Sequence, residues 1–390
     1  MSSIDNNAFA KAETDVLIDG WINTELEAIC DIKYGKDHKK LKEGVIPCYG
    51  SGGIMRYVEK GLYRKPSVLI PRKGTLSNLF YIDEPFWTVD TLFYTQINEE
   101  KVIPRYLYYL LKTFNLEDLN VGSAIPSLTT SVLNKVSLNI PNNLSEQKSI
   151  VRILKTFDDK IELLKAQNET LETIAQTLFN EWFVINPEEK EVENNWSLKS
   201  LNEISFNHSE TYKFDDGKVV FINTGDVLKG QFLHNNLSDP KSLPGQAKKA
   251  IYKHDILYSE IRPKNKRFAF VDFEQDNYVV STKFMIIRPK EGFSPFVLYQ
   301  IFKNQSMIDE FNLTAEARSG TFPQITFDSI KNIKVALPPK DILCDYEAIV
   351  RSIMDKKRNN NLQVIELKKM RNTILPKLMN GKIRIKEFQK

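Results

Sequence analysis

The chain has 390 residues, of which 42% are hydrophobic and 27% are charged, and its formal net charge is +4. This length allows two or three domains with substantial cores, and no run of about 18 apolar residues is present to form a membrane-spanning helix. The small positive charge permits nucleic-acid binding without requiring it, so the distribution of the basic residues matters more than their total.

The N-terminal residues 1–20 are polar and acidic and contain no apolar stretch of signal-peptide length, so we do not expect secretion. The three cysteines, Cys30, Cys48 and Cys344, are too few and too widely spaced for a disulfide framework or a zinc site. They fit reduced thiols, and we therefore expect a cytoplasmic protein.

Short apolar runs between glycine and proline residues follow this N-terminal segment and predict strands. They lie at 44–47, 67–71 and 86–90. Residues 104–114 open with proline and have one apolar face, which predicts a helix. The first part of the chain is therefore expected to be a module of mixed helices and strands.

From 145 to 184 the apolar positions alternate in steps of four and three residues, as in a heptad repeat. The expected seam comprises Ile150, Leu154, Phe157, Ile161, Leu164, Asn168, Leu171, Ala175, Leu178 and Trp182. A helix of this length with a single apolar stripe needs a partner helix, and a polar residue such as Asn168 fixes the register of a coiled coil. The alternative is a long core helix of one globular domain.

The second half of the chain repeats this order of elements. Strands are predicted at 219–222, 255–258, 268–271 and 284–287, and a helix at 295–302. A second long helix is predicted from about 341 to 380, with a weaker seam formed by Val350, Ile353, Val364, Leu367, Ile374 and Leu378 and interrupted by Lys357 and Asn360. Pro376 is expected to kink its last turns and Gly381 to end it. We interpret the basic run 356–361 as a solvated helix face.

Sequence matches between the halves indicate an internal duplication. Trp21, Leu26 and Ile29 match Trp196, Leu201 and Ile204, the segment 125–129 matches 322–326, and 150–152 matches 349–351. The duplication predicts an α+β protein in which two similar modules are joined by two long antiparallel helices with approximate two-fold symmetry. The expected divisions are an N-terminal extension 1–20, a first module 21–143, a long helix 144–185, a linker 186–195, a second module 196–338 and a C-terminal helix 339–382.

Common catalytic motifs fail at an essential position in this sequence. Met55 stands where a dinucleotide fingerprint starting at Gly50 needs its last glycine, and Gln231 stands where a phosphate loop starting at Gly225 needs lysine. The four histidines lack metal-ligand spacing, and we assign the carboxylates of 158–160 to the outer face of the coiled coil. We therefore predict no catalytic residue, no metal site and no cofactor in this chain.

Basic residues beside amides and aromatic residues in the turns of both modules are candidates for DNA binding. They are Lys36, Lys39, Lys40, Tyr49, Ser51, Arg56, Arg72, Lys73 and Asn78 in the first module, and Asn223, Thr224, Arg262, Lys264, Lys266, Arg267, Arg318, Thr321 and Gln324 in the second. Ordinary polar loops are the alternative interpretation. Two similar modules at a fixed separation favour DNA, because dimeric DNA readers have this arrangement.

The duplicated architecture resembles the specificity subunit of a type I restriction-modification enzyme. The resemblance rests on the repeat, on the module ends 128–141 and 322–338, on the helix ends 171–183 and 374–382, and on 258–267 and 318–323. It implies two target-recognition domains that each read one half of a bipartite double-stranded DNA target. It also implies a coiled coil that sets the gap between the halves.

The resemblance further implies partner subunits that carry the chemistry. Two modification subunits would supply adenine methylation with S-adenosylmethionine, and two restriction subunits would supply ATP-driven translocation and cleavage with Mg²⁺. The chain itself would be non-catalytic. The alternative from another class is a coiled-coil scaffold protein with duplicated binding modules and no role in DNA binding.

Overall fold

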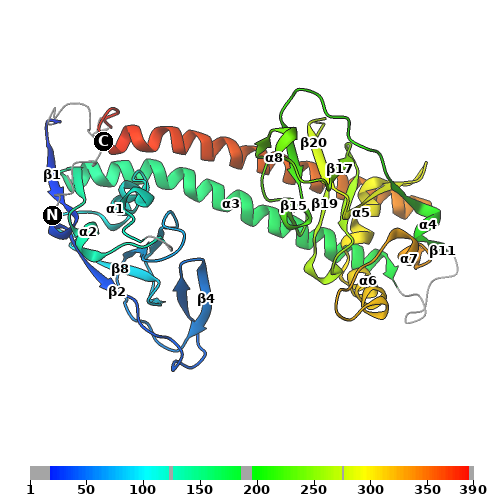
Figure 1. Ribbon diagram of the computed structural model, residues 1–390, viewed down its shortest axis with the longest axis horizontal. Coiled ribbons are helices and arrows are strands. Elements are labelled where there is room, and N and C mark those ends of the chain that lie inside the picture. Colours follow the sequence, from blue (N-terminus) through cyan, green and yellow to red (C-terminus); the bar gives the residue numbers. More distant parts are fainter. Residues whose placement is uncertain (1–17, 123–125, 186–195, 275, 386–390) are drawn as a thin grey trace. The chain divides into compact units, whose positions relative to one another are not determined.

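The computed structural model describes residues 18–122, 126–185, 196–274 and 276–385 (Figure 1). The chain divides into two compact units: Met1–Glu162 with Val364–Lys390 form unit 1, and Leu163–Gln363 form unit 2. Ile125 of the sequence repeat, the expected linker 186–195 and most of the expected extension 1–20 lie outside the described residues.

Two sheets and a strand pair form the module of unit 1. The strand β1 (Trp21–Glu25) pairs antiparallel with β9 (Ser137–Pro141). One sheet has the order β2-β8-β5-β6, with bounds Cys30–Tyr34, Leu92–Ile97, Ser67–Pro71 and Phe80–Ile82. The other has the order β4-β3-β7, with bounds Gly53–Val58, Ile46–Gly50 and Trp87–Thr88. Its central strand β3 pairs parallel with β7.

The helices of this module are short. They are η1 (Leu26–Ala28), α1 (Pro104–Leu111), η2 (Leu116–Leu119) and α2 (Thr130–Asn134). Every residue of β5 is buried, and Val68 and Ile70 share one core with Tyr106 and Leu110 of α1. The continuous apolar run that predicted this strand therefore reflects cover on both faces.

Unit 2 contains the same kinds of sheet. A small sheet has the order β10-β22-β11 (Val184–Ile185, Lys334–Leu337, Ser197–Ser200). A second has the order β12-β21-β18-β19 (Ser205–His208, Phe284–Pro289, Ile256–Ser259, Phe268–Phe270). A third has the order β16-β13-β20-β17 (Leu237–Ser238, Val219–Ile222, Tyr278–Ser281, Ala247–Ala250). The strands β14 (Val227–Leu228) and β15 (Gln231–Phe232) form a hairpin.

The helices of unit 2 are α4 (Leu201–Ile204), α5 (Pro295–Lys303), α6 (Gln305–Arg318) and α7 (Phe327–Ile330). Three single turns, η3 (Thr224–Asp226), η4 (Pro240–Ser242) and η5 (Pro263–Asn265), lie in its loops. The helix α6 was not predicted from the sequence and has 14 residues. It occupies the position in the chain where unit 1 has only η2.

The two modules share one topology, so the sequence repeat is also a repeat of the fold. The sheet β2-β8-β5-β6 of unit 1 has the connectivity of β12-β21-β18-β19 in unit 2, and each second sheet contains one parallel strand pair. In both units a helix that begins with proline, α1 or α5, follows the strand β8 or β21. The expected α+β class follows from these sheets and helices.

Two helices of 39 and 40 residues, α3 (Leu144–Trp182) and α8 (Lys340–Met379), run side by side (Figure 1). In unit 1 Arg371 bonds to Asp158. In unit 2 Asn361 accepts a hydrogen bond from Asn168, and the hydroxyl of Tyr346 donates to the carbonyl of Ala175. Residue numbers along α8 fall as those along α3 rise, so the pair is antiparallel, as expected.

Every residue of the expected seam is buried or half-buried. Leu154, Ile161, Leu164, Val350, Ile353 and Val364 are buried, whereas Phe157, Asn168, Leu171, Leu178, Leu367 and Ile374 are half-buried. The polar layer consists of Asn168 and the fully buried Asn360, whose amide donates to Asn168 at 2.9 Å. None of the helices in the described part of the chain is long and apolar enough to cross a membrane.

Three details differ from the expectations. Asp158 does not lie on an outer face, because Tyr109 and Arg371 both bond to it. The run 356–361 is not simply solvated, because Lys357 and Asn360 face α3. The end of α8 is as expected, because the helix continues through Pro376 to Met379 and Gly381 beyond it adopts a positive φ of +68°.

The third difference concerns the match of 150–152 with 349–351. Ile150 is buried and Ile349 is exposed, so the two isoleucines do not occupy equivalent positions. Tyr346 and Val350 are the buried pair that corresponds to Ile150 and Leu154. The two long helices therefore align without the insertion that the sequence match required.

Candidate nucleic-acid interface

The loop that follows β5 in unit 1 lies against the segment that precedes α2. The amide of Gly74 donates to the carbonyl of Pro126 at 3.1 Å, and the amide of Leu128 donates to the carbonyl of Arg72 at 2.9 Å. Between these two bonds, Lys73 and Ser127 form an isolated antiparallel bridge. The expected candidates Arg72 and Lys73 are thus fixed in the loop at the end of a buried strand.

Unit 2 forms the same junction after the equivalent strand β18. The amide of Arg262 donates to the carbonyl of Pro323 at 3.0 Å, and the amide of Ile325 donates to the carbonyl of Glu260 at 2.9 Å. Ile261 and Gln324 form the isolated bridge between them. The structure therefore brings the candidates Arg262 and Gln324 together, with Gln324 at the position of Ser127 and Arg262 at the position of Gly74.

The two junctions differ at the residue after the bridge. This residue is Gly74 in unit 1, with φ of +90°, and Arg262 in unit 2, with φ of +46°. A left-handed backbone is open to glycine, but it raises the energy of a residue with a side chain by about 1–2 kcal/mol. Unit 2 thus carries a strained arginine where unit 1 carries the residue that fits.

Several candidate side chains are already engaged within the protein. The guanidinium of Arg72 donates to the carbonyl of Asp90 at 3.1 Å and lies 5.4 Å from the ring centre of Tyr34. Arg56 donates to the carbonyl of Leu41, and Asn78 to that of Ser51. These side chains hold the loops of unit 1 in place.

The same holds for several candidates in unit 2. Arg267 donates to the carbonyls of Gly225 and Val227 at 2.9 and 3.0 Å, and Asn223 caps η3. Thr224 belongs to that same turn. Lys264 lies 3.8 Å from Glu316, Lys266 donates to Gln305, and Arg318 donates to Thr326. Thr321 is exposed, and Tyr49 and Gln324 are half-buried.

Other basic side chains are free to meet a ligand. Within the part of the chain that the structure describes, the terminal charges of Lys36, Lys39, Lys40, Lys73 and Arg262 have no hydrogen-bond or ion-pair partner. All five residues are exposed. A sixth, Lys229, is also exposed and was missed from the sequence. Its signal was the pair Lys229-Gly230 between two short apolar segments, which is typical of a hairpin turn.

A cluster of charged side chains in each unit joins the module to both long helices. In unit 1 the hydroxyl of Tyr109 on α1 donates to Asp158 at 2.5 Å, and Arg371 bonds to the same carboxylate at 2.6 Å. Burial and the adjacent carboxylate raise the pKa of Tyr109. Each side chain belongs to a different helix, so this junction fixes α1, α3 and α8 together.

In unit 2 the corresponding cluster holds one carboxylate and two ammonium groups. Glu172 lies 2.5 Å from both Lys303 on α5 and Lys357 on α8. Burial alone would raise the pKa of Glu172, but the two ammonium groups lower it to about 2. The side chain of Lys303 is only 4% exposed, and its burial lowers its pKa to about 8.

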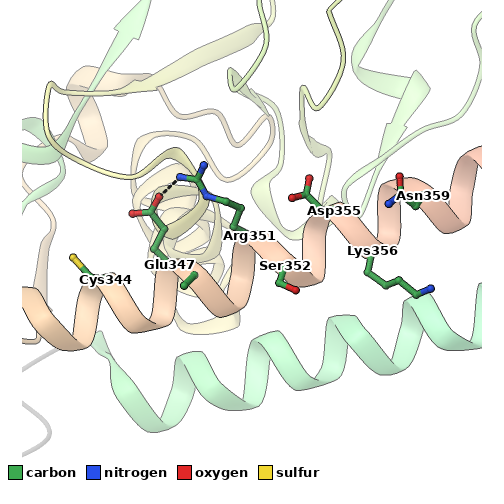
Figure 2. A pocket seen from close by; sticks show the side chains of 8 residues that line it. Cys344, Glu347, Arg351, Ser352, Asp355, Lys356 and Asn359 are labelled. Atoms are coloured by element: carbon green, nitrogen blue, oxygen red, sulfur yellow. Dashed lines mark hydrogen bonds and ion pairs between the residues drawn. The ribbon is translucent and has the colours of Figure 1, made fainter.

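A shallow groove runs along α8 in unit 2 (Figure 2). It is lined by Cys344, Glu347, Ala348, Arg351, Ser352, Asp355, Lys356 and Asn359. Arg351 pairs with Glu347 and lies 4.6 Å from the ring centre of Phe296. No group of three or more His, Cys, Asp or Glu side chains that could hold a metal ion occurs among the described residues.

Comparison with known proteins identifies the class. The family model described as the type I restriction modification DNA specificity domain matches the chain twice, at residues 18–173 and 193–372. The chain therefore belongs to the family of type I restriction-modification specificity subunits and carries the specificity domain in two copies. The resemblance inferred from the repeat is confirmed.

Individual relatives agree with this assignment. The chain is 28% identical over 355 residues to the MjaIX specificity subunit of Methanocaldococcus jannaschii, a match that covers 84% of this chain and 80% of that protein. It is 50% identical over 163 residues to the HindI specificity subunit of Haemophilus influenzae, a match that covers 41% of this chain and only 36% of that protein.

A solved structure has the same fold. The crystal structure of a type I restriction-modification S subunit from M. genitalium superposes with a TM-score of 0.61 at 16% identity, covering 94% of this chain and 97% of that one. The expected α+β fold with two similar modules and two paired long helices is confirmed.

Proposed function

We propose that each module reads one half of a bipartite double-stranded DNA target and that the chain has no catalytic role of its own. The observation that carries this proposal is the pair of equivalent loop junctions, one per unit. Both present basic side chains at the end of a buried strand, yet they differ in the residues they present. Lys73 and Ser127 stand where unit 2 has Ile261 and Gln324. Different side chains on one scaffold suit two different half-sites.

The paired helices would set the gap between the half-sites and dock the partner subunits. Their antiparallel pairing and the side-chain bonds between the two helices within each unit support this role. Leu163, Ile174 and Leu362 are exposed on the helix faces in unit 2, and apolar residues gathered on a surface favour protein contacts. The groove of Figure 2 adds a second candidate docking face.

The partners in this proposal are two modification subunits that methylate adenine with S-adenosylmethionine and two restriction subunits that translocate and cleave DNA with ATP and Mg²⁺. Support comes from the family assignment and from the loop junctions, which offer cations for phosphates. The chain would then contribute recognition and geometry, and its partners the bond-breaking and bond-forming steps.

The test combines a salt titration with a map of methylated sites. Binding of the full chain to duplex DNA should weaken steeply with NaCl, because neutralised phosphates release counterions. The variant Lys36→Ala/Lys39→Ala/Lys40→Ala should lower affinity. In cells that also carry the cognate methyltransferase, it should relax only the half-site read by the first module.

The second half-site on the same map is the internal control. Salt-independent or absent DNA binding by the wild-type chain would favour the scaffold alternative. A target without a gap, or relaxation of both halves by the triple variant, would reject the division into two readers.

A further inference from the structure

The two loop junctions are equivalent, and the one in unit 1 has glycine where unit 2 has Arg262. The fold therefore does not require an arginine at this position. Gly74 forms the same hydrogen bond to Pro126 that Arg262 forms to Pro323. Glycine therefore satisfies this turn without strain, as unit 1 demonstrates. A residue held in an unfavourable backbone conformation indicates a role beyond folding.

Two more cationic residues share this conformation next to Arg262. Lys229 has φ of +48° and Lys266 has φ of +54°. The amide of Lys229 donates to the carbonyl of Lys266 at 2.8 Å, and the amide of Lys266 donates to that of Pro263 at 2.9 Å. Three left-handed cationic residues thus meet around η5, within unit 2.

The tip of the β14–β15 hairpin fixes Lys229 in this cluster. Leu228 pairs with Gln231, so Lys229 and Gly230 form a two-residue turn with positive φ at both positions. The amide of Gly230 donates to the carbonyl of Phe268 at 2.8 Å, and Arg267 bonds to the base of the hairpin. The backbone beneath the Lys229 side chain is therefore held on both sides.

The free ends of these side chains distinguish two of the three residues. Lys266 donates to Gln305. In contrast, the ammonium of Lys229 and the guanidinium of Arg262 are without a hydrogen-bond or ion-pair partner in the described ranges, and both residues are exposed. A fixed backbone with an unpaired cation at its tip suits a ligand that is anionic and held at a set spacing.

We propose that Lys229 and Arg262 form a phosphate clamp, which binds the DNA backbone beside the half-site read by the second module. This inference rests on the proposed function and deepens it by separating positioning from reading. Contacts to phosphates fix the register of a protein on the duplex and carry no sequence information themselves. Cations on a fixed backbone are suited to that task, because little backbone freedom is lost on binding.

Substitutions at residue 262 separate strain from charge. Arg262→Gly removes both, Arg262→Ala removes the charge and retains a Cβ atom in the left-handed turn, and Arg262→Lys retains both. Stability should follow the backbone: the glycine variant of the full chain should melt about 2–4 °C above the alanine variant. DNA affinity should follow the charge, with the glycine and alanine variants equally weakened and the lysine variant close to wild type.

The measurement is the affinity of the full chain for duplex DNA as a function of NaCl concentration. Each lost phosphate contact should reduce the slope of log K against log salt by about 0.9, and Lys229→Gly should reduce it by the same amount again when combined with Arg262→Gly. A methylation map should still show the wild-type sequence at both half-sites, because the clamp does not read bases.

The outcomes are distinguishable. An unchanged salt slope in Arg262→Gly, with wild-type binding intact, would overturn the clamp and leave the proposed function standing. A wild-type chain without salt-dependent binding would overturn the proposed function itself. Arg262→Gly carries the residue that folds at the equivalent position of unit 1, so it tests the clamp even if Arg262→Ala fails to fold.

Discussion

Replacement of Glu172 by glutamine should destabilise unit 2 strongly, although the two residues have the same shape. Glu172 neutralises Lys303, whose side chain is 4% exposed, and also Lys357. Removing one member of a buried ion pair leaves an uncompensated charge, at about 3–5 kcal/mol. Because Glu172 is itself 38% exposed, solvent screens part of this loss, and we expect a value near the lower end, about 3 kcal/mol.

The assay is urea unfolding of the full chain at pH 7, followed by far-ultraviolet circular dichroism, which reports on both units. The control is Asp159→Asn on the same helix. Asp159 pairs with Lys155, and both side chains are about half exposed. Exposed pairs of this spacing contribute about 0.3–0.5 kcal/mol, so the control should shift the midpoint several-fold less than Glu172→Gln.

Equal losses in Glu172→Gln and Asp159→Asn would refute the reasoning, since they would show that Lys303 is not held as a buried cation. A further variant tests whether the three charges together stabilise unit 2. Replacing Glu172, Lys303 and Lys357 together with apolar residues removes all three charges and should recover most of the lost stability.

Three other predictions follow from described features. Glu172 has a folded-state pKa of about 2 against an ordinary value of 4.5. Its contribution to the free energy of unfolding should therefore be fully present above about pH 4.5 and disappear as pH falls toward 2. The difference in unfolding free energy between wild type and Glu172→Gln, measured against pH, should shrink over that window. Removing one heptad from each helix, 161–167 and 362–368, shortens the helix pair by about 10 Å. The gap in the methylated target should then shorten by up to about three base pairs, at about 3.4 Å each. An unchanged gap would reject a spacing role for the helices. Gly230→Ala places a Cβ atom 2.4 Å from the hydroxyl of Tyr299, at a residue whose φ is +86°. This variant should lower the free energy of unfolding by about 2 kcal/mol or more. The control is Gly225→Ala, whose Cβ atom meets no atom within 4 Å.

Local periodicity was sufficient to predict the long helices. The seam of α3 was readable because apolar residues recur at the helical spacing whatever surrounds them, and Leu154, Ile161 and Leu164 are all buried. The strand Ser67–Pro71 was readable for a similar reason, since a short apolar run bounded by proline fits a buried strand. For these elements, the pattern of apolar residues within the element is enough to predict which residues are buried.

Features that depend on residues far away in the sequence were not predicted. Asp158 was assigned to solvent because its neighbours are charged, but Tyr109 and Arg371, 49 and 213 residues away, bring it into a junction. Lys229 was passed over because its segment was tested only as a phosphate loop, and its strained backbone is visible only in three dimensions. The helix α6 was missed although its buried Met307, Phe311 and Ala315 recur every four residues, which is the helical spacing.

The sharing of the long helices between the units affects the order in which the chain matures during synthesis. The core of unit 1 includes Leu375, Leu378 and Met379 from the end of α8, whereas unit 2 ends at Gln363. At about 5–20 residues per second, the ribosome delivers those last side chains roughly 200 residues after the body of unit 1, or about 10–40 s later. Translation therefore supplies the complete set of core residues to the second unit before the first. Until then, the apolar residues at the start of α3 lack the end of α8 as a packing partner. During this interval the nascent chain is most exposed to chaperones or to mispairing.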